Sequence, residues 1–168
     1  HDQLDAFQWL TSYNYPICES TAIVDTGIAH GRFELLKWAV SSGYLHIDGR
    51  HPRIAASYGQ LEILKWCFSR YREEDSSVIR QDCWEQAAKY GHLNILQYLN
   101  QTFTTGYNPS IYLAAAQWNQ TEVLQWACNN GCPLPTTVPY PHSQTDICVN
   151  LARHGNLAML KVLRDKGC

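Results

Sequence analysis

The chain has 168 residues, of which 45% are hydrophobic and 12% aromatic, so it holds enough apolar side chains for a packed core and is not an intrinsically disordered segment. Its 13 basic and 15 acidic side chains give a formal charge of −2 without a Lys/Arg cluster, which argues against a nucleic-acid partner. No apolar run reaches the roughly 18 residues of a membrane span, so we expect no membrane partner either.

The seven cysteines form no CxxC pair and have no Cys/His spacing that suits zinc. A chain of this size does not need disulfides to fold. We therefore predict free and mostly buried thiols in a reducing intracellular compartment, the cytosol or the nucleus.

A helix-turn-helix unit recurs about every thirty residues along the whole chain. Its second helix carries apolar side chains at its first residue and two, three, five and six residues later, a face broad enough to be held by neighbours on both sides. The predicted starts of these second helices are Leu4, Phe33, Leu61, Leu93, Thr121 and Leu157. Five residues after each start stand Trp9, Trp38, Trp66, Tyr98, Trp126 and Val162, and we assign the four tryptophans a structural role.

The first helix of each unit is predicted to end in small residues, such as Ala87-Ala88, that let two helices approach closely. A residue suited to the left-handed conformation then ends the helix. These residues are Gly31, Gly59, Gly91, Asn119 and Gly155. The second helices are predicted to stop in a similar way at Gly43, Gly131 and Gly167. Cys132 and Cys168 follow the last two of these glycines, so we expect them to be packing residues of the loop.

Two segments depart from the repeat. We expect a polar loop over Ser69–Asp82 and an irregular, Pro-rich loop over residues 133–145.

The first unit contributes only a second helix, so its apolar face, with Phe7 and Trp9, requires a cover. Because the chain begins with His1 rather than Met, we expect it to be a processed or excised piece.

The segments AAKYGHLNILQYL and AASYGQLEILKW resemble an ankyrin-repeat array, with Ala-Ala-x-x-Gly-x-Leu-x-x-Leu as the shared pattern. The T-P-L-H start of the usual repeat is absent, so the resemblance implies reduced β-hairpins. The fold expected is one all-α domain over residues 1–168, a helical-repeat solenoid of about five and a half ankyrin-like units. The Trp position and the trailing Asn-Gly-Cys look like the divergent arrays of oomycetes, other microbial eukaryotes and their giant viruses.

Ankyrin-like proteins usually bind through a concave face, at the ends of their first helices and the adjoining loops. In this chain the last position of each first helix is aromatic or His in every complete unit, and a polar or charged residue often precedes it. The main candidates for partner binding are His30, Tyr58, Lys89, Tyr90, Gln117, Trp118, Arg153 and His154. The secondary candidates lie in loops and are Tyr44, His46, Tyr71, Arg72, Tyr107 and Tyr140. Two interpretations of the aromatic positions stay open, a recognition surface and a seam that packs upon itself.

We predict a non-enzymatic module that binds a protein partner and no cofactor, metal or small-molecule substrate. The style of repeat implies a secreted pathogen effector that acts inside host cells. The alternatives are a structural spacer in a longer chain and an enzyme or metal site near residues 133–148, where His142 and Cys148 lie. No catalytic triad or metal motif supports the second alternative.

Overall fold

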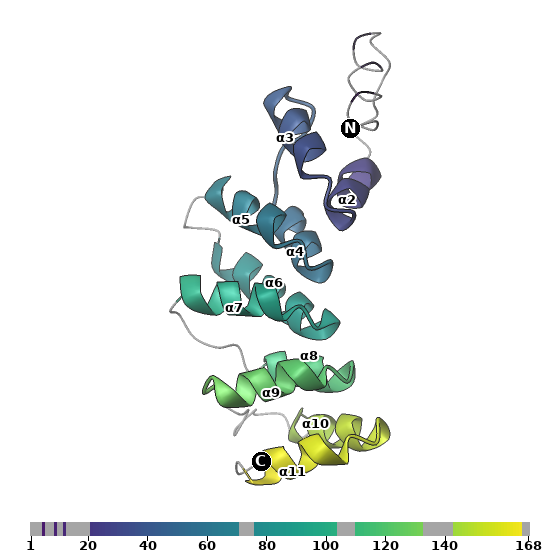
Figure 1. Cartoon of the computed structure of the whole chain (residues 1–168), viewed down its shortest axis with the longest axis vertical. Coiled ribbons are helices and arrows are strands. Elements are labelled where there is room, and N and C mark those ends of the chain that lie inside the picture. Colours follow the sequence, from purple (N-terminus) through teal and green to yellow (C-terminus); the bar gives the residue numbers. More distant parts are fainter. Residues whose placement is uncertain are drawn as a thin grey trace.

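The computed structural model describes residues 21–70, 76–103, 110–132 and 143–165, together with residues 5, 9 and 12. Within these ranges all the regular structure is helical and no strand occurs. The helices form consecutive antiparallel pairs (Figure 1). The pairs are α2 (Thr21–Ala29) with α3 (Phe33–Ser41), α4 (Arg50–Ser57) with α5 (Leu61–Arg70), α6 (Ser76–Tyr90) with α7 (Leu93–Thr102), α8 (Ser110–Gln117) with α9 (Thr121–Asn129), and α10 (Ser143–Arg153) with α11 (Leu157–Asp165).

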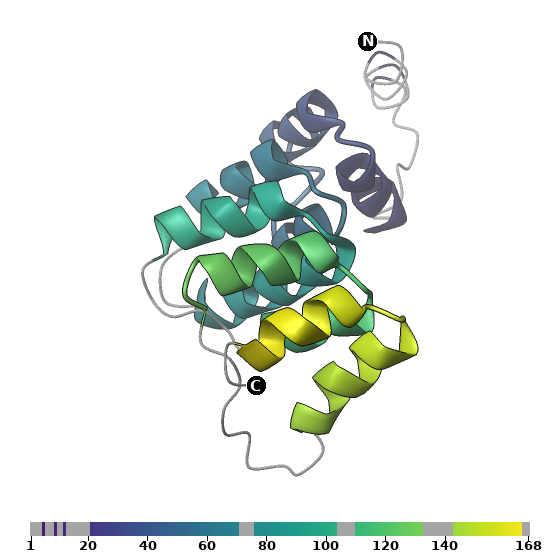
Figure 2. The same ribbon diagram turned by 60° about the horizontal axis from the view of Figure 1, so that its bottom comes forward.

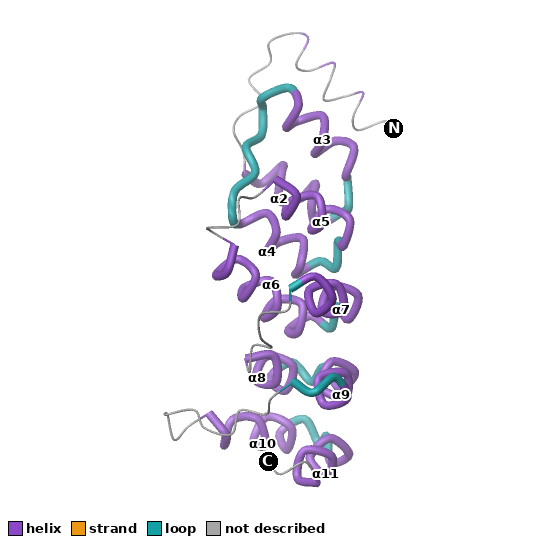
Figure 3. The backbone as a smooth tube through the Cα atoms, turned by 90° about the vertical axis from the view of Figure 1, so that its left-hand side faces the viewer, coloured by secondary structure: helices purple, strands orange, loops and turns teal. Residues whose placement is uncertain are grey.

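The pairs stack in chain order along the long axis of the molecule, from α2–α3 at one end to α10–α11 at the other (Figure 1). Each first helix contacts the first helix of the next pair, so that α2, α4, α6, α8 and α10 form one layer. Figure 3 shows this layer on one side and the second helices α3, α5, α7, α9 and α11 on the other. Equivalent residues of successive pairs therefore lie in columns along the stack.

The second helices begin at the residues on which the repeat is aligned, namely Phe33, Leu61, Leu93, Thr121 and Leu157. Two residues earlier the backbone takes a positive φ in each pair, which allows the sharp turn between the two helices. The residues with this conformation are Gly31, Gly59, Gly91, Asn119 and Gly155. Asn119, with φ of 54°, is the non-glycine member, and Asn tolerates this region better than other residues with a Cβ.

The core lies between the two layers and between successive pairs. The residues two and three positions after the start of α5, α7 and α9 are buried, as with Ile95 and Leu96. The small pairs at the ends of the first helices, Ala55-Ala56, Ala87-Ala88 and Ala115-Ala116, are fully buried, which lets neighbouring helices approach closely. Burying one such Leu or Ile side chain contributes about 1.5–3 kcal/mol to folding.

The polar face of the second helices carries i,i+3 ion pairs. Lys37 Nζ lies 2.9 Å from Glu34 Oε1, and Lys65 Nζ lies 2.8 Å from Glu62 Oε1. All four side chains are substantially exposed, so water screens these pairs and they add little stability. No helix in the described part of the chain is long and apolar enough to cross a bilayer.

Three expectations from the sequence need correction. The loop predicted over Ser69–Asp82 is wrong at both ends, because α5 continues to Arg70 and α6 begins at Ser76. The early start of α6 is stabilised by Ile79, which packs against the core, and by Arg80, whose guanidinium lies 4.8 Å from the Phe103 ring centroid.

The other two corrections concern a loop and a tryptophan. Helix α10 begins at Ser143, inside the expected Pro-rich segment, and residues 133–142 lie outside the described part. Trp9, expected to be packed like the other tryptophans, is 60% exposed. Trp38, Trp66 and Trp126 are half-buried. Trp66 meets Phe33 edge-on, with the ring centroids 5.6 Å apart.

Candidate protein-binding surface

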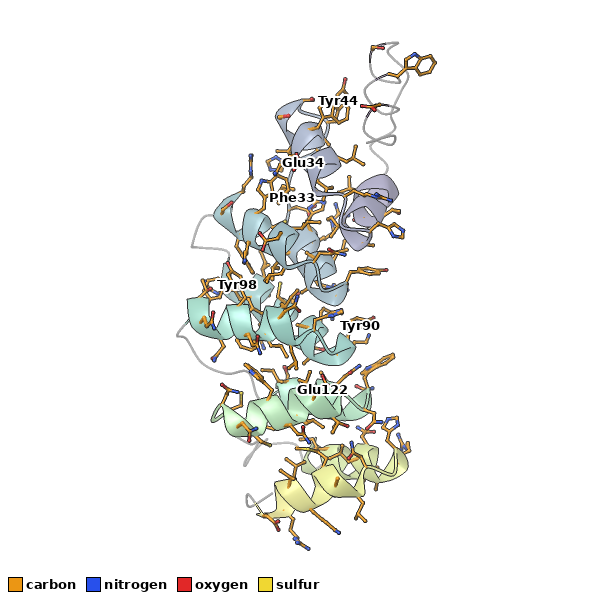
Figure 4. All side chains as sticks on the ribbon, viewed as in Figure 1. Phe33, Glu34, Tyr44, Tyr90, Tyr98 and Glu122 are labelled. Atoms are coloured by element: carbon orange, nitrogen blue, oxygen red, sulfur yellow. The ribbon has the colours of Figure 1, made fainter. Side chains whose placement is uncertain are left out.

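Each first helix ends beside an aromatic or His side chain at the turn into its second helix. These five residues, His30, Tyr58, Tyr90, Trp118 and His154, are called the aromatic column here. They stand three residues before the start of α3, α5, α7, α9 and α11, so the stacking of the pairs places them along one edge of the molecule. Figure 4 shows Tyr90 on this edge, at the turn between α6 and α7, and Tyr98 near the opposite edge.

The members of the aromatic column are exposed. Tyr58 is 57% exposed, Trp118 49% and Tyr90 43%, and both histidines fall in the exposed class as well. The alanine pairs that stand two and three residues before Tyr58, Tyr90 and Trp118 are fully buried, so the boundary between core and surface is sharp. Large exposed aromatic side chains on rigid helix ends are a common feature of protein-recognition surfaces.

Tyr90 and Trp118 form the aromatic contact within the described part of the column. Their ring centroids lie 6.1 Å apart at an interplanar angle of 43°. The ammonium group of Lys89 lies 4.5 Å from the Trp118 centroid and 5.0 Å from the Tyr90 centroid, close enough for cation–π attraction to both rings. The two rings thus pack against each other, as a self-packed seam would, and still expose nearly half of their surface.

A second set of side chains fixes the position of the column. The residue just before a second helix reaches back to the preceding pair and donates to the carbonyl oxygen next to a column residue. Gln60 Nε2 donates to Ala29 O at 3.1 Å, His92 Nε2 to Ser57 O at 2.9 Å, and Gln120 Nε2 to Lys89 O at 3.1 Å. At the next step His154 Nε2 donates to Gln117 O at 3.1 Å. These carbonyls end helices and lack partners within them, so the bridges satisfy them while joining successive pairs.

The bridging side chains also explain why a glycine stands at the turn. A Cβ on Gly59 would lie 2.7 Å from His92 Nδ1, and one on Gly91 would lie 2.5 Å from Gln120 Oε1. Both glycines have a positive φ, 72° and 80°, so a side chain there would also be strained in the backbone. The turn therefore needs glycine for two separate reasons.

Sequence reasoning missed the bridging residues Gln60, His92, Gln120 and Asn156. The signal was present, because each of these positions directly before a second helix carries an amide or an imidazole. Asn156 differs from the other three in its partners, because it donates to side chains and not to a backbone carbonyl. Its Nδ2 donates to Asn119 Oδ1 at 3.0 Å and to Thr121 Oγ1 at 2.8 Å. His92 also occupies the N-cap position of α7.

The remaining predicted residues divide into two groups. Gln117 and Arg153 are exposed next to the column. Tyr44 and His46 are exposed but follow the far end of α3, and the Tyr44 ring lies 5.6 Å from that of Trp38. The structure does not bring these two loop residues to the aromatic column, because α3 separates them from His30. Tyr71, Arg72, Tyr107 and Tyr140 lie outside the described residues.

Four of the thiols in the described part of the chain lie in the core rather than on this surface. Cys67, Cys83, Cys128, Cys132 and Cys148 are free, and the first four are buried. Burial raises the pKa of Cys67 and of Cys132 to about 12 and also raises the pKa of Cys83. The Cys132 carbonyl accepts a hydrogen bond from the Tyr112 hydroxyl at 3.0 Å, which fits a packing role for this residue.

The described residues hold no group of three or more His, Cys, Asp or Glu side chains that could bind a metal ion. Of the two residues singled out near the Pro-rich segment, Cys148 is half-buried in α10 and His142 lies outside the described part.

The described part of the chain is all-helical and is built from stacked antiparallel helix pairs. Comparison with curated proteins finds a mimivirus protein, from Acanthamoeba polyphaga mimivirus, that is named as an ankyrin repeat protein. It is 25% identical over an alignment of 126 residues, which covers 58% of this chain and 29% of the relative. The chain thus matches less than a third of the relative's length. This similarity confirms the resemblance to a divergent ankyrin-like repeat. No protein-family model matches the chain, and no solved structure matches it.

Proposed function

We propose that the chain is a non-enzymatic protein-interaction module that binds a protein partner through the aromatic column and its polar neighbours. The surface comprises His30, Tyr58, Lys89, Tyr90, Gln117, Trp118, Arg153 and His154. The observation that carries this proposal is the exposure of Tyr58, Tyr90 and Trp118 on one edge, next to columns of buried alanines. The similarity to an ankyrin repeat protein supports an interaction module in general terms.

The physical argument rests on rigidity. Four of the column residues, His30, Tyr58, Tyr90 and Trp118, stand at helix ends that a side-chain bridge ties to the next pair, so their backbone positions are fixed before any partner arrives. Tyr and Trp side chains have few rotatable bonds and offer large contact areas, so they lose little entropy on binding. A preorganised aromatic edge therefore converts more of its contact area into affinity than a mobile loop of the same composition.

The wider architecture is part of the proposal. We infer a single helical-repeat solenoid of about five and a half ankyrin-like units with reduced β-hairpins. Support comes from the regular stacking of the first helices and from the absence of strands in the described ranges. In such an array equivalent surface positions line up, which suits an extended partner surface.

The test begins with affinity purification and mass spectrometry from the relevant cell, followed by titration of the purified partner that is recovered. The variant Tyr58→Ala/Trp118→Ala should weaken that binding by more than tenfold, while its helical CD spectrum stays that of the parent chain. A loss of this size corresponds to more than about 1.4 kcal/mol, as expected for two truncated hot-spot residues.

A matched control replaces exposed residues away from the column. Tyr44→Ala/Gln125→Ala removes a tyrosine of similar exposure, 52%, and an exposed polar residue on the second-helix side. This control should bind as the parent does. Equal binding by the parent and the Tyr58→Ala/Trp118→Ala variant would show that the partner docks elsewhere.

The cellular setting is a further part of the proposal. We infer a reducing intracellular compartment from the five free thiols in the described chain. The effector role, implied by the style of repeat, is tested by expressing the chain in candidate host cells and scoring host responses for the parent and the Tyr58→Ala/Trp118→Ala variant. Equal responses to the two proteins would refute an effector role that uses this surface.

A further inference from the structure

The turns that lead into the second helices differ in charge from the rest of the chain. The four residues before each of α3, α5, α7, α9 and α11 include three basic side chains, Arg32, Lys89 and Arg153, and no Asp or Glu. The whole chain has a formal charge of −2 and these turns contribute +3, so the remaining residues together carry −5. Figure 2 shows the turns α6–α7, α8–α9 and α10–α11 on one side of the stack. The edge that bears the aromatic column is therefore positive on an otherwise acidic chain, and we call it the positive edge.

The cations of the positive edge have no acidic partner in the described part of the chain. On the second helices, by contrast, Lys37 and Lys65 are held by carboxylates 2.9 and 2.8 Å away. Neither Lys89 nor Arg153 forms an ion pair with a described carboxylate, although Glu85 stands one helical turn before Lys89. Arg153 is also exposed, so both charges are accessible to the carboxylates of a partner.

Lys89 lies in the middle of the positive edge and is held in place by two rings. Its ammonium lies 4.5 Å from the Trp118 ring centroid and 5.0 Å from that of Tyr90, and the residue is half-buried. Its N–H groups make no hydrogen bond to an acceptor among the described residues. A half-buried ammonium is stabilised best by a carboxylate, which accepts short charge-assisted hydrogen bonds from it. The position therefore fits a carboxylate that a partner supplies.

The position of Lys89 also selects against a basic partner. An exposed Tyr–Trp pair by itself would attract a lysine or arginine of the partner through cation–π contacts. Here the Lys89 ammonium already lies over both rings, so a second cation would meet a like charge at close range. A nucleic acid is disfavoured as well, because its closely spaced phosphates require a dense row of basic side chains, whereas the turns α4–α5 and α8–α9 carry no Lys or Arg.

We propose that the partner presents an extended acidic segment to the positive edge, an inference that rests on the proposed function. One carboxylate of the segment binds the Lys89 ammonium, and an apolar side chain beside it packs on the Tyr90 and Trp118 rings. A second carboxylate binds the Arg153 guanidinium, two units further along the stack. Packed helices lie about 8–10 Å apart, so two steps span roughly 16–20 Å, and an extended chain advances about 3.3 Å per residue. The two carboxylates are therefore about five or six residues apart in the segment.

A random peptide library displayed on phage tests the chemistry of the partner without knowledge of its identity. Selection is carried out in parallel on the 168-residue chain and on the Tyr58→Ala/Trp118→Ala variant. Peptides that the parent enriches over this variant should be rich in Asp and Glu, poor in Lys and Arg, and should carry acidic residues about five or six positions apart. The charge-reversal variant Lys89→Glu/Arg153→Glu should keep the helical CD spectrum and lose the enrichment of acidic peptides.

The most enriched peptide, synthesised with a fluorescent label, is then titrated by anisotropy. Lys89→Gln should weaken its binding about fivefold, the upper range for a partly exposed ion pair, and Lys89→Arg should retain most of the affinity. Added NaCl should weaken binding to the parent, because salt screens the charges, and should weaken binding to Lys89→Gln less. Lys161→Gln is the matched control, since it removes an exposed lysine of α11 outside the positive edge, and it should leave the affinity unchanged.

The possible outcomes separate this inference from the proposed function. Enrichment of uncharged or basic peptides that the Tyr58→Ala/Trp118→Ala variant does not bind would overturn the acidic segment and leave the binding surface in place. No enrichment over that variant would count against both. Equal effects of Lys89→Gln and Lys161→Gln would show that Lys89 does not receive the carboxylate. Binding of a labelled single-stranded oligouridylate as tight as that of the selected peptide would make a nucleic acid the occupant instead.

Discussion

The imidazole of His92 donates from Nε2 to the carbonyl oxygen of Ser57 at 2.9 Å, which joins the start of α7 to the end of α4. Its other nitrogen, Nδ1, lies so close to Gly59 that a Cβ there would be 2.7 Å away. One side chain thus satisfies a helix-terminal carbonyl, joins two units and limits the turn residue to glycine. Gln60 and Gln120 repeat the arrangement in the units on either side.

Gly59→Ala should destabilise the chain more than Gly131→Ala. Both glycines have similar backbone conformations, with φ of 72° and 71°, so each substitution carries a left-handed backbone penalty of about 1–2 kcal/mol. Only the Cβ at Gly59 meets a neighbour, because nothing lies within 4 Å at Gly131. Urea denaturation of the two variants measures the difference, which reports the close approach of His92.

The double variant Gly59→Ala/His92→Ala separates the steric cause from other effects. Removing the imidazole should relieve the clash, so the two substitutions together should cost less than the sum of the two single ones. Additive costs would show that His92 does not press on this turn.

Leu96→Ala should lower the free energy of unfolding by about 2–5 kcal/mol, because it leaves a cavity in the core. The Leu96 side chain is fully buried between α7 and its neighbours. Leu157→Ala is the matched control, since Leu157 is 60% exposed and its truncation removes little contact. Differential scanning calorimetry should show a clear fall in Tm for the first variant alone. An unchanged Tm for Leu96→Ala would contradict the alignment of the units.

The stability of the fold should decrease as the pH falls below about 6.5, the ordinary pKa of histidine, because of His51. Burial lowers the pKa of His51, the Asp48 carboxylate opposes the shift, and Arg50 adds to it. The ring is therefore neutral in the fold at pH 7, and its Nδ1 accepts a hydrogen bond from the Asp48 amide at 2.9 Å. The unfolded chain binds a proton at this residue more readily, so acid favours unfolding.

Denaturation midpoints at pH 7.5 and 5.5 test the effect of His51. The parent should lose stability between these values, and His51→Gln should lose less. His30→Gln, a change at an exposed histidine, should keep the parental dependence. The Asp48 carboxyl does not enter this window, because hydrogen bonding by Arg50 lowers its pKa from an ordinary value of 3.8. Equal slopes for the parent and His51→Gln would exclude His51 as the origin.

Cys67 and Cys132 should resist alkylation in the folded protein. Both are buried, and burial raises the pKa of each thiol to about 12, so the reactive thiolate is scarce at pH 8. Iodoacetamide labelling followed by peptide mass spectrometry should find these two residues unmodified before unfolding and modified after it in guanidinium chloride. Rapid labelling of either one in the folded state would contradict its burial.

Much of the fold could be predicted from the sequence because the repeat is local. The turn residue Gly91, the apolar pair Ile95 and Leu96, and the start of α7 at Leu93 all follow from helix-ending chemistry and from periodicity within one unit. The aromatic column could be located in the same way, since its residues hold a constant place before each second helix. Short-range rules fail at α6, where residues 76–82 look like a polar loop but form a helix because Ile79 reaches a core built by other units.

Only the tertiary structure decided which of the repeated positions are exposed to water. Sequence alone treats Ala88 and Ala152 as equivalent, yet one is fully buried and the other exposed, because burial depends on whether a neighbouring unit is stacked against it. The same holds for the bridges, since His92 and Ser57 stand 35 positions apart and meet only when two units stack. Periodicity sets the unit, but contacts between units, which arise from packing, determine what remains on the surface to bind.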